Sequence, residues 1–241
     1  MKSTERHQLK QDRFLTTLNE TMLQIEQHRK RMLAGVVALV VIGAAVTGYL
    51  LWQRNRNEQA ARMLTDAVVI AEAPVADAED APKPPSGTYT SERAKLEASL
   101  PKFLAVAEAF PKTQAGLAGR YHAAANLAAL GRYEEAAKRY QEVVDLAGDS
   151  VYGSMARLGL AEAQLSQRQF EPAINTFKQL SVNPAAEVPV DGVLMQLGRA
   201  YLLAGRKPEA VQSFKRITSE FPTSPFAAEA RRELDALSAG A

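Results

Sequence analysis

Residue types that could perform chemistry are sparse in this chain. Its histidines are His7, His28 and His122, and no two of them are spaced to bind a metal from one helix face. Cysteine is absent, which excludes disulfides, thiolate nucleophiles and cysteine metal ligands. The sequence also lacks a glycine-rich phosphate loop and a nucleophile elbow. We therefore predict that the protein is not an enzyme, with no catalytic residue, metal site, cofactor or small-molecule substrate.

The charged clusters predict solvent-exposed helix surface rather than a reactive site. Glu134 and Glu135 are adjacent, and residues 231–233 read Arg-Arg-Glu within a helical pattern. His122 is the only histidine in the second half of the chain, and we expect an ordinary helix residue there. The net charge of the 241-residue chain is +2 at pH 7, so binding of nucleic acid is not expected.

One long apolar segment bears on the cellular location of the rest of the chain. Residues 32–52 contain no charged side chain, and as a helix they would extend about 31 Å, close to the thickness of a bilayer core. A signal peptide has an apolar region of only about 7–15 residues after a short basic start. Here 31 residues precede the segment. The sequence therefore predicts an uncleaved transmembrane helix over 32–52, with the lipid bilayer as a partner.

Basic residues on the two sides of this segment predict its orientation. Seven lysines and arginines precede it, whereas three arginines follow it closely, namely Arg54, Arg56 and Arg62. Because cytoplasmic flanks carry the excess of positive charge, we expect the N-terminus in the cytoplasm. The C-terminal domain is then outside, which in a two-membrane bacterium means the periplasm. The expected location is thus the bacterial inner membrane, crossed once.

The remaining segments differ clearly in composition. Residues 1–31 predict a basic cytoplasmic helical tail, either extending the spanning helix or lying on the membrane surface or a partner. Residues 53–73 continue as a juxtamembrane helix, and residues 74–90 form a proline-rich linker. Residues 91–241 are alanine-rich with helical periodicity, and no segment alternates long enough to predict a strand.

The C-terminal part repeats itself with a period of 37 residues. Matching sets include an alanine, an aromatic four residues later and an aliphatic residue three further on. These sets are Ala136, Ala173 and Ala210; Tyr140, Phe177 and Phe214; Val143, Leu180 and Ile217. Gly131 and Gly205 lie two periods apart with Arg168 between them, and the dipeptide Phe-Pro at 110–111 recurs at 221–222. A period of this length indicates stacked helix pairs.

This pattern resembles the tetratricopeptide repeat, and residues 197–222 match that family best. Small residues for the helix contacts would be Ala124, Ala161 and Gly198 in the first helices. The resemblance implies an all-α fold, in which one N-terminal transmembrane helix is followed by a right-handed helical solenoid with a capping helix near 225–237. Arg120, Arg157 and Leu194 stand where the family has an aromatic residue. The alternative is an unrelated alanine-rich helical bundle.

In that family a concave groove is lined by first-helix positions, and it binds other proteins. Carried onto this sequence, the groove residues are Tyr121, Leu158, Glu162, Leu165, Met195, Arg199 and Leu202. This set lacks the lysines and asparagines with which some relatives clamp a terminal carboxylate. It suits an exposed hydrophobic stretch of another chain, because methionine and leucine adapt to varied shapes. Alternatively, these residues pack against a neighbouring helix such as 57–73.

The whole layout resembles the YfgM-type ancillary subunits of the SecYEG translocon, a family whose repeat domain is related to that of the CpoB cell-division coordinator. The stretch AGLAGRYHAAANLAALGRYEEAAKRYQEVV, residues 115–144, carries most of this resemblance. It implies a membrane-tethered, holdase-like chaperone factor in the periplasm, with translocon subunits, periplasmic chaperones or unfolded clients as partners.

Two other functions remain open from the residues. The chain could be a structural scaffold subunit of an envelope or membrane complex, for cell division, outer-membrane assembly or respiration. It could also be a cytosol-facing organellar import receptor, which would require the inverted topology.

Overall fold

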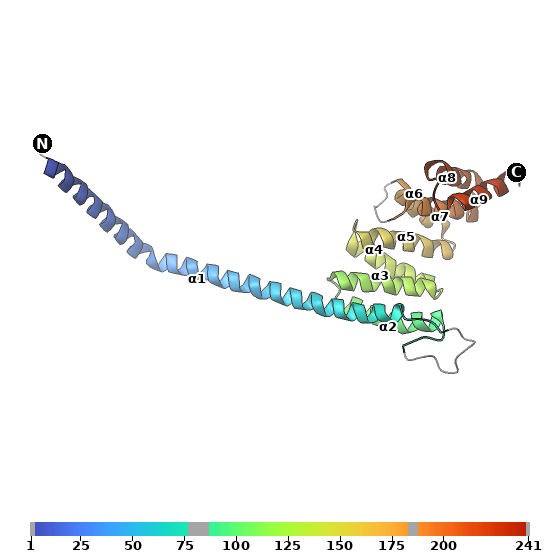
Figure 1. Cartoon of the computed structure of the whole chain (residues 1–241), viewed down its shortest axis with the longest axis horizontal. Helices are drawn as coiled ribbons and strands as arrows, with labels where there is room; N and C mark the ends of the chain where they lie inside the picture. The colour runs from blue at the N-terminus through green and yellow to red at the C-terminus, as the bar shows by residue number, and fades with distance from the viewer. Residues whose placement is uncertain (1–2, 77–86, 183–187, 240–241) are drawn as a thin grey trace. The chain divides into compact units, whose positions relative to one another are not determined.

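The computed structural model describes residues 3–76, 87–182 and 188–239, with side chains from residue 31 onward. The middle of the predicted linker, residues 77–86, and the side chains of residues 1–30 in the predicted cytoplasmic tail therefore lie outside the description. Within these ranges the chain forms α-helices, and its extended pairing is limited to one isolated bridge between Val75 and Tyr89 (Figure 1). The predicted all-α fold class is confirmed.

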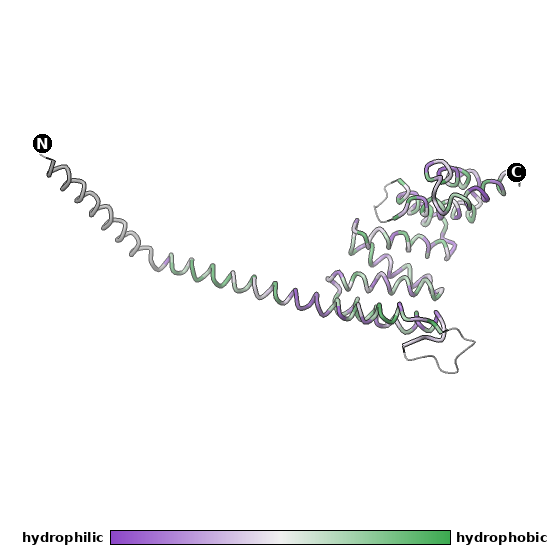
Figure 2. Tube along the Cα trace, in the orientation of Figure 1, coloured by the Kyte–Doolittle hydropathy of each residue, from purple (hydrophilic) through white to green (hydrophobic). Residues whose placement is uncertain are grey.

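The first helix, α1, runs from Ser3 to Ala71 and contains the apolar segment. The chain divides into two compact units at this helix, Met1–Asn55 and Arg56–Ala241. In the first unit the apolar side chains lie open, with Leu39 70 % and Val40 66 % exposed. Figure 2 shows this part of α1 as a continuous hydrophobic stretch. Among the described residues, α1 is long and apolar enough to cross a membrane.

The C-terminal part of α1 belongs to the second unit and packs like a repeat helix. Ala60 and Ala67 are completely buried, and Leu64 and Val68 pack against the same hydrophobic cluster as α2, Glu92–Ala109. The guanidinium of Arg56 donates a 3.1 Å hydrogen bond to the backbone carbonyl of Ala109 at the end of α2. The predicted juxtamembrane segment thus forms a helix pair with α2.

In the part of the chain that the structure describes, three further helix pairs and a closing helix follow in order, each packed on the one before (Figure 1). They are α3 (Gln114–Ala129) with α4 (Tyr133–Ala147), α5 (Val151–Ser166) with α6 (Phe170–Val182), α7 (Val190–Leu203) with α8 (Lys207–Glu220), and α9 (Ala227–Ala239). The core includes the residues that recur every 37 positions, since Ala136, Ala173 and Ala210 are completely buried. Phe177 and Phe214 are buried equally. The repeat therefore sets the packing of this unit.

The turns inside the pairs α3–α4, α5–α6 and α7–α8 share one backbone conformation. Gly131, Arg168 and Gly205 have φ angles of 78°, 60° and 74°. In each turn the next residue donates its N–H to a carbonyl five positions back, at 2.8 to 2.9 Å. Such a left-handed residue ends a helix and suits glycine, whereas Arg168 adopts it at a steric cost.

Close contacts explain why small residues stand in the first helices. A methyl group at Gly198 of α7 would lie 2.3 Å from a ring carbon of Phe214, so glycine is needed where this ring crosses the helix. At Gly159 of α5 a methyl group would lie 2.4 Å from the ring of Tyr140. Gly198 is the predicted contact position, while the repeat pattern does not single out Gly159.

Candidate protein-binding groove

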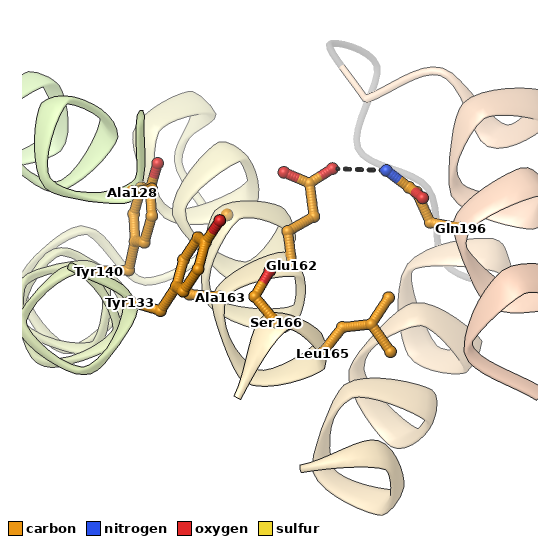
Figure 3. A pocket seen from close by; sticks show the side chains of 9 residues that line it. Ala128, Tyr133, Tyr140, Glu162, Ala163, Leu165, Ser166 and Gln196 are labelled. Carbon is orange, nitrogen blue, oxygen red and sulfur yellow. Dashed lines mark hydrogen bonds between the residues drawn. The ribbon is translucent and has the colours of Figure 1, made fainter. Parts of the chain in front are cut away.

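The first helices of the pairs lie side by side, since α3 contacts α5 and α5 contacts α7. A cavity of about 340 Å³ opens on this face, bounded by α5, α7 and the α3–α4 hairpin (Figure 3). Its lining residues are Ala128, Tyr133, Tyr140, Gly159, Glu162, Ala163, Leu165, Ser166 and Gln196. Two of the predicted groove residues, Glu162 and Leu165, are thus among the residues that line this cavity.

Glu162 is the charged residue that lines this cavity. One of its carboxylate oxygens accepts a 3.1 Å hydrogen bond from the side-chain amide of Gln196 on α7. Burial raises the pKa of Glu162 above the ordinary value, and the hydrogen bond from Gln196 opposes this shift. The structure thus places a partly desolvated carboxyl group with one amide donor at the α5–α7 junction.

A polar chain continues from Glu162 toward the C-terminal helix. The amide oxygen of Gln196 accepts a 3.4 Å hydrogen bond from the guanidinium of Arg199, which also pairs with Glu229 of α9 at 2.5 Å. Two predicted groove residues, Glu162 of α5 and Arg199 of α7, are thereby connected through Gln196, and the series of side chains continues to Glu229 of α9. This network of side chains contains two carboxylates and one guanidinium, so it has a net negative charge when both acids are ionised.

Tyr121 of α3 lies in an aromatic cluster beside the cavity. Its ring centroid is 5.9 Å from that of Tyr140 and 5.8 Å from that of Tyr152. Burial raises the pKa of Tyr121, and the negative charge of Glu162 raises it further. The negative charge of Glu162 therefore acts on the tyrosine cluster beside the cavity.

The predicted leucines are half-buried. Leu158, Leu165 and Leu202 each pack against the hydrophobic cluster that α5 to α9 share, and each keeps part of its surface open. Their arrangement supplies apolar surface along the first-helix face.

Met195 differs from the prediction, because its side chain is only 1 % exposed. It stands one period after Leu158, but α7 is covered by the segment that leads into α9. The ring of Phe226 would lie 3.4 Å from a methyl group at Gly192, one turn before Met195. Ser224 donates a 2.6 Å hydrogen bond to Asp191 of α7. Burial therefore removes Met195 from the surface that a partner could contact.

The alternative that these residues merely pack against 57–73 applies to one end of the groove. Tyr121 packs against the cluster that Leu64 and Val68 of α1 also join. No described residue of α1 lines the cavity around Glu162 and Leu165. The two ends of the predicted groove thus differ, and the cavity is the accessible part.

His122 lies outside the cavity, half-buried on α3, where its ring stacks on Phe103 with centroids 5.0 Å apart. Burial lowers the pKa of His122, and the charge of Glu72 opposes this shift. Among the described residues no group of three histidine, aspartate or glutamate side chains is placed to hold a metal ion. The described residues on this face offer hydrogen bonds, one carboxylate and apolar surface.

Sequence reasoning missed Gln196, Tyr133 and the role of Tyr140. Gln196 precedes the predicted Arg199 by three residues, and this spacing places both on one helix face. The repeat pattern assigns Tyr140 to the core, yet its ring also borders the cavity. Tyr133 follows directly from the α3–α4 turn, which no repeat motif marks as a binding position.

Comparison with known proteins agrees with the helix-pair architecture. The tetratricopeptide repeat-like domain family matches residues 25–216, so the chain belongs to this family. Its repeat fold is generally a protein-binding scaffold rather than a catalytic one. No curated protein matches the chain significantly.

Solved structures with a similar fold have distant sequences. The nearly identical TPR-like repeats of a Podosopora anserina protein described as a kinesin light chain are 16 % identical with a TM-score of 0.52. That match covers 76 % of this chain and 84 % of the other. MamA is 16 % identical with a TM-score of 0.51, covering 61 % of this chain and 78 % of MamA. At these identities the likeness establishes the fold alone.

Proposed function

We propose that this protein is a membrane-anchored protein-binding module whose repeat domain works outside the cytoplasm. It would serve there as an ancillary translocon subunit or a holdase-like factor for secreted and envelope proteins. The observation that carries the proposal is the cavity beside Glu162 and Leu165, open on the first-helix face of a tetratricopeptide repeat-like chain. The sequence resemblance to the YfgM-type translocon subunits supplies the more specific role.

The anchoring part of the proposal depends on residues 32–52. Their apolar side chains are exposed throughout, which is costly in water and favourable in lipid. The seven basic residues before the segment and the three after it favour a cytoplasmic N-terminus. We therefore propose a single-pass protein of the bacterial inner membrane with residues 56–241 in the periplasm.

The proposed mechanism requires no covalent chemistry. A tether keeps a weak binding surface close to the membrane, so that effective concentration replaces high affinity. Half-buried leucines such as Leu158 and Leu202 would cover apolar segments of an emerging chain for a short time. Transient cover of this kind slows aggregation without trapping the client.

Site-specific photo-crosslinking tests the proposal. A photoreactive residue at Leu165, which lines the cavity, should capture newly exported polypeptides in intact cells. The matched control is Lys215, which is exposed on the second helix α8. Crosslinks from position 165 and not from 215 are expected. Equal labelling from both positions, or no labelling from 165 in a folded and expressed protein, would contradict the proposal.

A structural scaffold subunit is the second candidate, and exposed aliphatic side chains outside the cavity favour it. Val182 at the end of α6 is 71 % exposed, and Leu146 near the end of α4 is 59 % exposed. A permanent partner could cover both. Purification in mild detergent separates the two functions, since a scaffold subunit would leave the membrane with one stoichiometric partner, whereas a client-binding factor would not.

A further inference from the structure

The cavity on the first-helix face combines aromatic surface with one acidic group. Tyr133 and Tyr140 contribute ring surface on the side of α4, and Glu162 contributes the carboxylate on the side of α5 (Figure 3). The described residues that line the cavity include no lysine or arginine. The geometry points to a subsite for one basic side chain, the arginine or lysine of a bound polypeptide; this rests on the proposed protein-binding function.

The carboxylate of Glu162 is incompletely partnered for an ionised group. One oxygen accepts the hydrogen bond from Gln196, and the other lies on the side of the tyrosine hydroxyls (Figure 3). An amide donor compensates a buried negative charge far less than a cation does. Burial accordingly raises the pKa of Glu162. A guanidinium or ammonium group entering the cavity would supply the missing countercharge.

The cation already in the network is occupied elsewhere. Arg199 pairs with Glu229 of α9, and Gln196 stands between Arg199 and Glu162. Because this network holds two carboxylates, Glu162 and Glu229, and one guanidinium, Arg199, it attracts one more positive charge. It discriminates against an acidic side chain for the same reason, because like charges brought together in a half-buried site repel strongly.

The repeat itself indicates that Tyr140 does more than fill the core. The equivalent positions, one and two periods later, are Phe177 and Phe214, and both are completely buried. Tyr140 differs from them by a hydroxyl group and by lining the cavity. Tyr133 adds a second ring, and aromatic faces attract arginine and lysine. The cavity volume of about 340 Å³ is at the lower end of ligand pockets, which suits a single long side chain.

A matched set of peptides tests this subsite with the full chain in detergent. Short unstructured peptides rich in leucine and serine are immobilised in three versions, with a central arginine, its neutral isostere citrulline, or glutamate. Wild-type protein should bind the arginine version about tenfold more tightly than the citrulline version, which corresponds to ~1.4 kcal/mol. It should bind the glutamate version most weakly.

Variants assign the preference to the cavity. Glu162→Gln should reduce the ratio of arginine to citrulline binding to about one, since the removed charge is the basis of the preference. Tyr133→Leu should lower the ratio partly, because it keeps apolar surface and loses the ring. Glu108→Gln, at an exposed glutamate of α2 outside the cavity, should leave the ratio unchanged. Circular dichroism confirms that each variant is folded.

The outcomes separate this inference from the function on which it rests. Equal binding of all three peptide versions by the wild type would overturn the basic-side-chain subsite and leave protein binding intact. An arginine preference that survives Glu162→Gln would also overturn it. If no version binds the folded wild-type protein and no crosslink forms at Leu165, the proposed function itself fails.

Discussion

Glu162 of α5 and Gln196 of α7 are joined by a 3.1 Å hydrogen bond that links the first helices of two successive repeats. The bond stands at the edge of the cavity (Figure 3). A carboxyl group half-buried in this way costs stability when ionised, because the amide of Gln196 offsets only part of its desolvation. Residues that weaken the fold in the absence of a partner are characteristic of binding sites.

The first prediction concerns the stability of Glu162→Gln. Burial raises the pKa of Glu162 in the folded state, so its protonated form stabilises the fold. This stabilisation is complete at a pH below the ordinary pKa of about 4.5. It is lost as the pH rises through the raised pKa of the folded state. An amide at position 162 does not titrate and keeps a hydrogen-bonding oxygen for Gln196. Urea unfolding should show Glu162→Gln more stable than wild type at pH 7, with the difference shrinking toward pH 4. A difference independent of pH would contradict the assignment.

The second prediction concerns the turn at Arg168. Its φ of 60° is the conformation that glycine adopts at Gly131 and Gly205, and a non-glycine residue there costs roughly 1–2 kcal/mol. Arg168→Gly should therefore stabilise the protein by up to about 1 kcal/mol, after the greater flexibility of glycine in the unfolded chain is subtracted. The reciprocal control, Gly205→Arg, should destabilise by a similar amount. Chemical denaturation of the full chain measures both changes.

The third prediction concerns the contact between Gly198 and Phe214. A methyl group at 198 would come within 2.3 Å of a carbon of the phenyl ring, and this ring is completely buried. Gly198→Ala should lower the free energy of unfolding by about 1–3 kcal/mol. The double variant with Phe214→Leu should recover part of the loss, since the smaller side chain frees space. Additive losses in the double variant would show that the two residues do not compete for one volume.

The sequence predicted much of this architecture because the repeat is a packing rule. Residues at equal phase, such as Ala136, Ala173 and Ala210, are buried together. Residues at equal phase also share a backbone conformation, since Gly131, Arg168 and Gly205 all have a positive φ. The position of a residue within the repeat therefore predicts which side of a helix faces the core.

The position within the repeat could not predict what covers the side of a helix that faces away from the core. Leu158 and Met195 have the same phase, but Leu158 is half-buried, whereas Met195 is 1 % exposed on a helix whose first turn contacts Ser224 and Phe226. Gln196 escaped notice because its role depends on an acid 34 positions earlier in another helix. Such pairings form between successive repeats, so the sequence pattern within one repeat does not predict them.

The most direct test of the central claim is the side of the membrane on which the repeat domain lies. Because the chain has no cysteine, single substitutions provide clean labelling sites. Lys215→Cys on α8 and Lys10→Cys before the apolar segment are treated with a membrane-impermeant maleimide in intact spheroplasts. We predict that position 215 is labelled at once, position 10 only after the membrane is opened, and the protein stays in the membrane through alkaline washing. Labelling of position 10 alone in intact spheroplasts, or a freely soluble mature protein, would contradict the account.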